Sequence, residues 1–199
     1  ALSERLGEQI LVGVDTSTRH GSTYFSNSPV DGEWKRFVSE RLVGEIDRRY
    51  RTLGRGEGRA LIGHSTGGFN AISLALQYPE LFRNVGASAL DALDQAHWLL
   101  GPDRRVRPEW LAWARLEQGV GGVGQFASYG ASWTPDVARE SGYRVPFDPR
   151  TGKLVASDWE RWQEHDPIAL VKGTHRILSG RIFITVGAKD EFGLAEPAR

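Results

Sequence analysis

The pentapeptide G-H-S-T-G at residues 63–67 is the part of the sequence best suited to chemistry. An apolar run precedes it and a helix-like segment follows, so Ser65 falls on a sharp strand-to-helix turn. Such a turn lifts a hydroxyl above the edge of a sheet, and flanking glycines avoid clashes with the strand and the helix. The backbone N–H of Thr66 would then face a developing oxyanion. We therefore predict that Ser65 is a nucleophile; the alternative is a serine that only caps the helix.

A serine nucleophile needs a base, and an acid that orients the base. Asp190, in G-A-K-D-E-F after the last predicted strand, is the candidate acid. Asp91 and Asp94, after the preceding strand, are alternatives, and Asp190 could instead be an ordinary turn residue. The chain order Ser, Asp, His is typical of this strand–turn–helix arrangement. The chain has five histidines, all of which precede Asp190: His20, His64, His97, His165 and His175. We therefore expect the base to lie outside these 199 residues.

Two other glycine patterns have the spacing of phosphate-binding motifs but lack their context. G-V-G-G-V-G at 119–124 follows a helical stretch rather than a strand, which favours a helix end and a loop over dinucleotide binding. G-R-A-L-I-G-H-S at 58–65 carries His64 where a phosphate loop has lysine. We therefore predict no nucleotide, no metal and no organic cofactor.

The elements around Ser65 alternate between strand and helix. Apolar runs predict strands at 9–15, 59–63, 84–90 and 181–187, and helical periodicity predicts helices at 34–50 and 66–78. This alternation indicates an α/β fold with a parallel sheet and helices on both faces. Residues 97–165 break the alternation and hold six of the seven tryptophans. We interpret them as an insertion above the sheet within a single domain, 1–199.

The tryptophan-rich insertion is the predicted wall of a substrate pocket. Trp98 and Trp133, with His97, are the residues that we expect to line it, together with the loop at Tyr24–Phe25. The alternative is that these tryptophans only pack beneath a cap, as large aromatic side chains commonly do.

Composition narrows the class of partner. The chain has 25 basic and 25 acidic residues, so its formal net charge is zero and nothing favours nucleic acid. No run approaches the roughly 20 apolar residues of a membrane span. The first residues lack the pattern of a signal peptide, which slightly favours the cytoplasm. There is no cysteine, hence no disulfide framework. We expect a small-molecule substrate.

The sequence resembles the Putative esterase group of α/β-hydrolases, which includes esterase D (S-formylglutathione hydrolase) and enterochelin-esterase-like proteins. The resemblance covers nearly the whole chain, and G-H-S-T-G-G and G-A-K-D-E-F are its most specific parts. It implies that Ser65 is the nucleophile, Asp190 the acid of a catalytic triad and the Thr66 backbone one oxyanion donor. In this group a histidine follows the acid and a His-Gly loop precedes the first strand seen here. We therefore expect the sequence to be a central fragment of the fold.

The resemblance implies a serine esterase that hydrolyses carboxylic esters, for example short-chain or acetyl esters, through an acyl-enzyme on Ser65. Two alternatives stay open. An acyltransferase would use the same nucleophile with an alcohol in place of water, and a binding module would keep the fold without catalysis. We expect the 199 residues alone to be inactive, since the histidine is absent.

Overall fold

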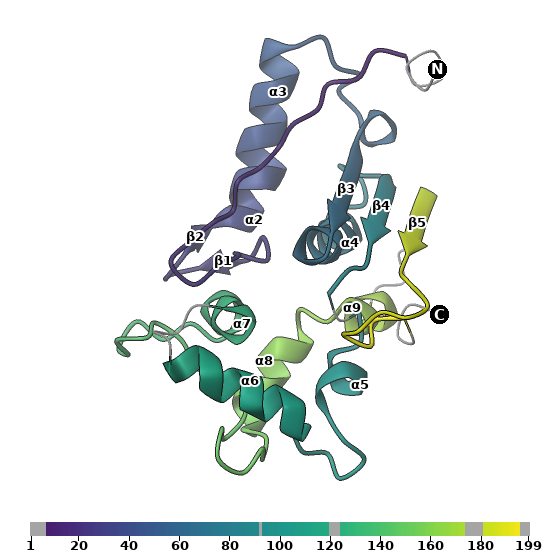
Figure 1. Cartoon of the computed structure of the whole chain (residues 1–199). Coiled ribbons are helices and arrows are strands. Elements are labelled where there is room, and N and C mark those ends of the chain that lie inside the picture. The colour runs from purple at the N-terminus through teal and green to yellow at the C-terminus, as the bar shows by residue number, and fades with distance from the viewer. Residues whose placement is uncertain (1–6, 92, 120–123, 174–180, 196–199) are drawn as a thin grey trace.

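A parallel three-stranded sheet forms the centre of the fold (Figure 1). The computed structural model describes residues 7–91, 93–119, 124–173 and 181–195. Strand β4 (Asn84–Ser88) lies between β3 (Ala60–His64) and β5 (Arg181–Thr185), and the register aligns Ile62 with Gly86 and Phe183. Three of the four predicted strands and the α/β fold class are thus confirmed.

Helix α4 (Thr66–Gln77) packs against β3 and β4 and buries most of its length. Its apolar side chains join those of the sheet in one core, which includes Ile72, Leu74, Val85 and Ala87. On the opposite face, Ile62 is 81% exposed and Phe183 68%. In the ranges that the structure describes, the helices therefore cover one face of the sheet rather than the two that we expected.

The helix predicted at 34–50 is present, with an irregular centre. It consists of α2 (Trp34–Arg36), a π-helical stretch η1 (Phe37–Leu42) and α3 (Val43–Arg49). Val38 is buried, and Leu42 and Val43 pack beside it against the core around α4. A short hairpin of β1 (Asn27–Ser28) and β2 (Gly32–Glu33) leads into this helix.

The strand predicted at 9–15 is wrong. Within the described ranges these residues pair with no strand, and Ile10, Leu11 and Val12 are 47%, 89% and 45% exposed. An apolar, β-branched run becomes a strand only when a neighbouring strand supplies its hydrogen bonds. No such partner lies beside it in the described part of the chain.

Residues 97–165 fold around an aromatic core that Tyr24 and Phe69 share. The carboxyl ends of the three strands point toward this part of the molecule (Figure 1). Its elements are α5 (Gln95–Leu99), α6 (Pro108–Gly119), α7 (Gln125–Trp133) and α8 (Ala156–Gln163), and α9 (Pro167–Gly173) returns to α4. The core includes Tyr24, Phe69, Trp98, Trp110, Phe126, Tyr129, Trp133, Phe147, Trp159 and Trp162.

The G-V-G-G-V-G segment ends a helix, as predicted, because α6 stops at Gly119; residues 120–123 lie outside the described ranges. Helix α7 then begins after Gly124, and the buried carboxylate of Glu117 accepts the backbone amides of Gln125, Phe126 and Ala127 at 2.8, 2.9 and 3.1 Å. A side chain on one helix thus supplies acceptors for the free amides at the start of the next.

Within the described ranges, no helix is both long and apolar enough to cross a membrane.

Candidate functional site

Ser65 occupies a sharp turn between β3 and α4. Its backbone has φ 54° and ψ −125°, a left-handed conformation that side-chain-bearing residues rarely adopt. A residue held in such a sparsely populated backbone conformation costs about 1–3 kcal/mol. Non-glycine residues are held in such conformations mainly at sites where geometry matters more than stability.

The turn needs glycine at Gly63. A Cβ atom there would lie 2.0 Å from the backbone oxygen of Gly67, since the strand and the helix almost touch at this point. A Cβ at Gly68 would lie 2.8 Å from Cβ of Leu90, whereas one at Gly67 would meet nothing within 4 Å. The tight approach that we predicted is therefore present, but the second glycine that it requires is Gly68 rather than Gly67.

The surroundings of Ser65 suit a nucleophile better than a helix cap. Although Ser65 is the N-cap residue of α4, its side chain makes no capping hydrogen bond. Thr66 is the first residue of the helix, so its amide has no acceptor within the helix. The dipole of this 12-residue helix favours negative charge at the same end. The Thr66 amide therefore has no acceptor within the helix, and its role as an oxyanion donor stays a prediction.

Asp91 lies closest to the Ser65 hydroxyl among the alternative acids. Ser65 Oγ is 3.5 Å from Asp91 Oδ1, which is a weak hydrogen bond. Thr66 Oγ1 and the Tyr24 hydroxyl donate to Asp91 Oδ2 at 2.9 and 2.8 Å. Asp91 is therefore too close to Ser65 for an imidazole ring to fit between the two groups.

Burial governs the ionisation of Asp91 and of the two tyrosines near it, Tyr24 and Tyr129. Asp91 is 6% exposed, and loss of water raises the pKa of its carboxyl, while hydrogen bonds from Tyr24, Thr66, Ser65 and Tyr129 act in the opposite direction. Burial, together with neighbouring negative charge, also raises the pKa of Tyr24 and Tyr129 well above the usual value. Both phenols therefore stay protonated and available as donors near neutral pH.

Asp190 follows β5 at the same sheet edge at which Ser65 follows β3. Its Oδ1 accepts the backbone amides of Phe192 and Leu194 at 3.0 and 3.2 Å. These bonds fix the carboxyl group in a turn, and its role as a triad acid stays a prediction. Asp94, the other alternative, caps α5 by accepting the amide of His97 at 2.9 Å.

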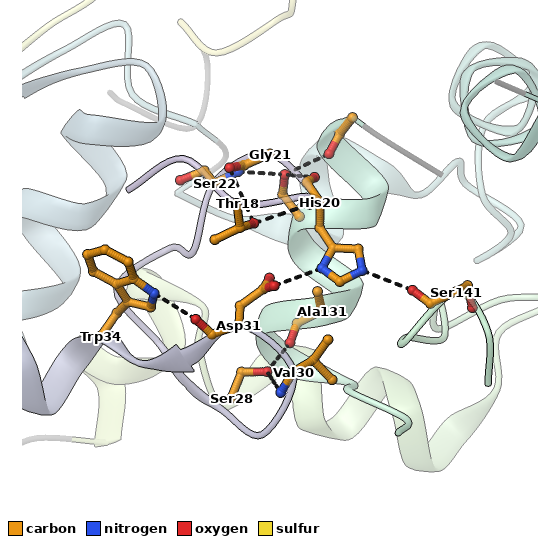
Figure 2. A network of polar contacts seen from close by, with 12 residues as sticks. Thr18, His20, Gly21, Ser22, Ser28, Val30, Asp31, Trp34, Ala131 and Ser141 are labelled. Atoms are coloured by element: carbon orange, nitrogen blue, oxygen red, sulfur yellow. Dashed lines mark hydrogen bonds and ion pairs between the residues drawn. The ribbon is translucent and has the colours of Figure 1, made fainter. Parts of the chain in front are cut away.

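The histidines of the described ranges occupy separate places. His20 is buried: Nδ1 lies 2.8 Å from Asp31 Oδ1 and Nε2 3.0 Å from the Ser141 carbonyl (Figure 2). His165 stacks on Trp133, with ring centroids 5.4 Å apart. His64 and His97 are exposed, and His175 lies outside the described residues. The hydrogen bond of the Ser65 hydroxyl runs to Asp91 instead.

Trp98 and Trp133, which we expected in a pocket, are 5% and 2% exposed. Trp133 donates through its indole nitrogen to Ser26 Oγ at 3.1 Å, and Trp98 packs on Trp110 with ring centroids 4.3 Å apart. Both belong to the aromatic core in this structure, and a pocket role for them and for the exposed His97 stays a prediction. Two hollows elsewhere on the surface are lined mainly by residues 101–111 and 31–41.

A comparison with known families identifies the family of the chain. The sequence matches the family model described as Putative esterase over residues 1–198. The chain belongs to the Putative esterase family. The resemblance proposed from G-H-S-T-G-G and G-A-K-D-E-F is thereby confirmed.

The matches to individual relatives each cover only part of the relative's length. Over 88 residues, the chain is 36% identical to the uncharacterized protein YjcH of Bacillus subtilis (strain 168), a match that spans 42% of this chain and 36% of YjcH. The crystal structure of MPT51 (FbpC1) of Mycobacterium tuberculosis is similar with a TM-score of 0.46 and 20% identity, over 88% of this chain and 54% of MPT51. The chain thus spans about a third to a half of the length of these two relatives.

Sequence reasoning missed Tyr24 as a partner of the site. We named it only as part of a possible pocket loop, yet its hydroxyl holds the carboxylate beside Ser65. Tyr24 and Phe25 also have φ of 46° and 43°. Neither residue type signals a left-handed backbone, because glycine and asparagine are the usual choices there. No pattern in the sequence could have identified this pair.

Proposed function

We propose that the protein is a serine esterase in which Ser65 forms an acyl-enzyme with a carboxylic ester. The observation that carries this proposal is the backbone of Ser65, φ 54° and ψ −125°, at a strand–helix junction where Gly63 and Gly67 are in near contact. Membership of the Putative esterase family supports it. The strained turn leaves the hydroxyl beside a free helix amide, which is the arrangement that acyl transfer requires.

The reaction takes two steps. A histidine base removes the Ser65 Oγ proton while Oγ attacks the ester carbonyl carbon, and the Thr66 amide donates to the oxyanion. The protonated base then gives its proton to the leaving alkoxide, so an alcohol departs and the acyl-enzyme remains. Water, deprotonated by the same base, attacks the acyl carbon. The bond between that carbon and Oγ then breaks, the base returns its proton to Ser65 Oγ, and the carboxylic acid is released.

We propose that the base and the second oxyanion donor come from parts of the protein outside these residues, and that Asp190 orients the base. His20 and His165 support this proposal, because Asp31 and Trp133 already hold their rings. We accordingly expect the 199 residues alone to hydrolyse esters far more slowly than the full-length protein.

Hydrolysis of a chromogenic short-chain ester by the full-length protein tests the proposal. We expect Ser65→Ala to lower kcat by at least about 10³-fold, because the nucleophile is lost. Ser157→Ala, which alters an exposed serine on α8, is the matched control and should keep full activity. Equal turnover by Ser65→Ala and the parent would refute the assignment. Product analysis with an added acceptor alcohol distinguishes hydrolysis from acyl transfer to the alcohol.

A further inference from the structure

Asp91 connects the two residues on which the proposed chemistry depends. Its backbone amide donates to the Ser65 carbonyl at 3.3 Å, and its carboxylate accepts the Thr66 hydroxyl at 2.9 Å. The same carboxylate lies 3.5 Å from Ser65 Oγ. One residue thus contacts the backbone of the turn, the nucleophilic oxygen and the side chain of the proposed oxyanion donor.

The loop after β4 is bent so that Asp91 reaches this place. Ala89 has φ 40°, in the left-handed region that an alanine rarely adopts, and its amide donates to the Thr185 carbonyl at 2.7 Å. The chain therefore turns at the sheet edge and brings Asp91 beneath Ser65. Non-glycine residues with strained backbones persist where the surrounding structure holds them, and they cluster at functional sites.

Tyr24 fixes the carboxylate from the other side. Its hydroxyl donates to Asp91 Oδ2 at 2.8 Å, and its ring packs on Phe69, Tyr129 and Trp133 with centroids 5.4, 4.4 and 5.2 Å apart. With 3% of its surface exposed, Tyr24 has little freedom to move. The groups that face the Asp91 carboxylate are hydroxyls: Tyr24, Tyr129, Ser65 and Thr66.

We propose that Asp91 is a positioning residue for acyl transfer: its ionised carboxylate, held by Tyr24, keeps Ser65 Oγ and the Thr66 amide in the geometry for attack. The proposal rests on the proposed function of Ser65. A 3.5 Å contact is weak, so it orients the hydroxyl without retaining the proton that the base must take. The shorter bond to Thr66 holds the first residue of α4 firmly, and with it the direction of its amide.

The proposal gives a pH dependence with a definite sign. Burial raises the pKa of Asp91, and the Tyr24 hydrogen bond lowers it. Removal of the Tyr24 hydroxyl therefore raises this pKa further, and the carboxylate is lost at a higher pH than in the parent. If ionised Asp91 positions Ser65, the loss of activity caused by protonation of Asp91, as distinct from protonation of the histidine base, moves to higher pH in Tyr24→Phe. A tyrosine that only fills the core would leave the profile in place.

The experiment compares Tyr24→Phe with the parent in the full-length protein, with a short-chain ester across the pH range. We expect kcat to fall about tenfold, KM to change less than about twofold, and the loss of activity that protonation of Asp91 causes to move to higher pH. Tyr143→Phe is the matched control, because Tyr143 is also buried but lies against His20 rather than Asp91. It should leave kcat and the pH profile unchanged.

Asp91→Asn and Asp91→Ala provide a second measurement should Tyr24→Phe fold poorly. The asparagine keeps an oxygen that can accept from Thr66, so we expect it to retain more activity than the alanine and to lose the pH dependence of Asp91. Unchanged kcat and pH profile in Tyr24→Phe and Asp91→Asn, with turnover still dependent on Ser65, would overturn this proposal alone. A parent whose turnover does not depend on Ser65 would overturn the proposed function as well.

Discussion

The carbonyl oxygen of Gly67 lies 2.0 Å from the place that a Cβ atom would take at Gly63. The atoms that this Cβ would meet all belong to the backbone of Gly67 and Gly68, so a side chain at Gly63 cannot be accommodated by a change of rotamer. Gly63→Ala must push β3 and α4 apart, and we expect it to cost at least about 1–3 kcal/mol of unfolding free energy, as overpacking does. Urea denaturation measures the change.

Gly67→Ala is the control for that prediction. A Cβ there meets nothing within 4 Å, and alanine is the better helix former at the start of α4. We expect unchanged or slightly increased stability. If the two substitutions had equal effects on the urea midpoint, the close approach of β3 and α4 would be wrong.

The strain at Ser65 predicts a conflict between stability and activity. Glycine adopts a backbone with φ 54° without penalty, so Ser65→Gly should be more stable than Ser65→Ala by about 1 kcal/mol. Both variants should lack esterase activity. Thermal unfolding of the two variants measures the difference, and an alanine variant at least as stable as the glycine variant would show that the turn is relaxed.

The elements near Ser65 were predictable because the information is local. The strand, turn and helix at 60–77 depend on neighbouring residues, and their pattern identified Ser65, Thr66 and the approach at Gly63. The run at 9–15 has equally good strand residues, but its pairing depends on a partner distant in sequence. Local pattern cannot supply that partner, which is why this prediction failed.

The contacts around the site were not predictable for the same reason. Tyr24 and Asp91 are 67 residues apart, and His20 and Ser141 are 121 apart. Hydrogen bonds between residues so far apart in sequence depend on tertiary packing, here including the contacts of Tyr24 with Tyr129 and Trp133 of the insertion. A single sequence names the residue types but not these pairings.

The buried pair of His20 and Asp31 should hold the loop that carries Tyr24 in place. Their side chains are 5% and 4% exposed, and the second imidazole nitrogen bonds the Ser141 carbonyl (Figure 2). Asp31→Ala would leave Nδ1 of His20 without its partner, and we expect a loss of about 1–3 kcal/mol in unfolding free energy, the cost of a buried polar group left unpaired. Urea denaturation tests this, with Glu33→Ala as the control. Glu33 pairs with Arg36 in solvent, so its removal should change little.

The lowered pKa of His165 predicts that the folded protein loses stability in acid. Burial, with smaller contributions from Lys35 and Arg161, lowers the pKa of His165 to about 4. The unfolded chain binds a proton near pH 6.5 and the folded chain does not, so stability falls as the pH drops from about 6.5 to 4, by up to about 3 kcal/mol. His165→Phe should remove that part of the pH dependence in denaturation curves. An unchanged slope would show that His165 is hydrated; the exposed His64→Gln serves as control.

Covalent labelling of the full-length protein by a small alkyl fluorophosphonate tests the central claim most directly, because the reagent phosphonylates an activated serine. Mass spectrometry of the digested protein should find one adduct, on the peptide that contains Ser65. The adduct should persist in Ser157→Ala and disappear in Ser65→Ala. Ester turnover that continues in Ser65→Ala, with the adduct on another residue, would contradict the account.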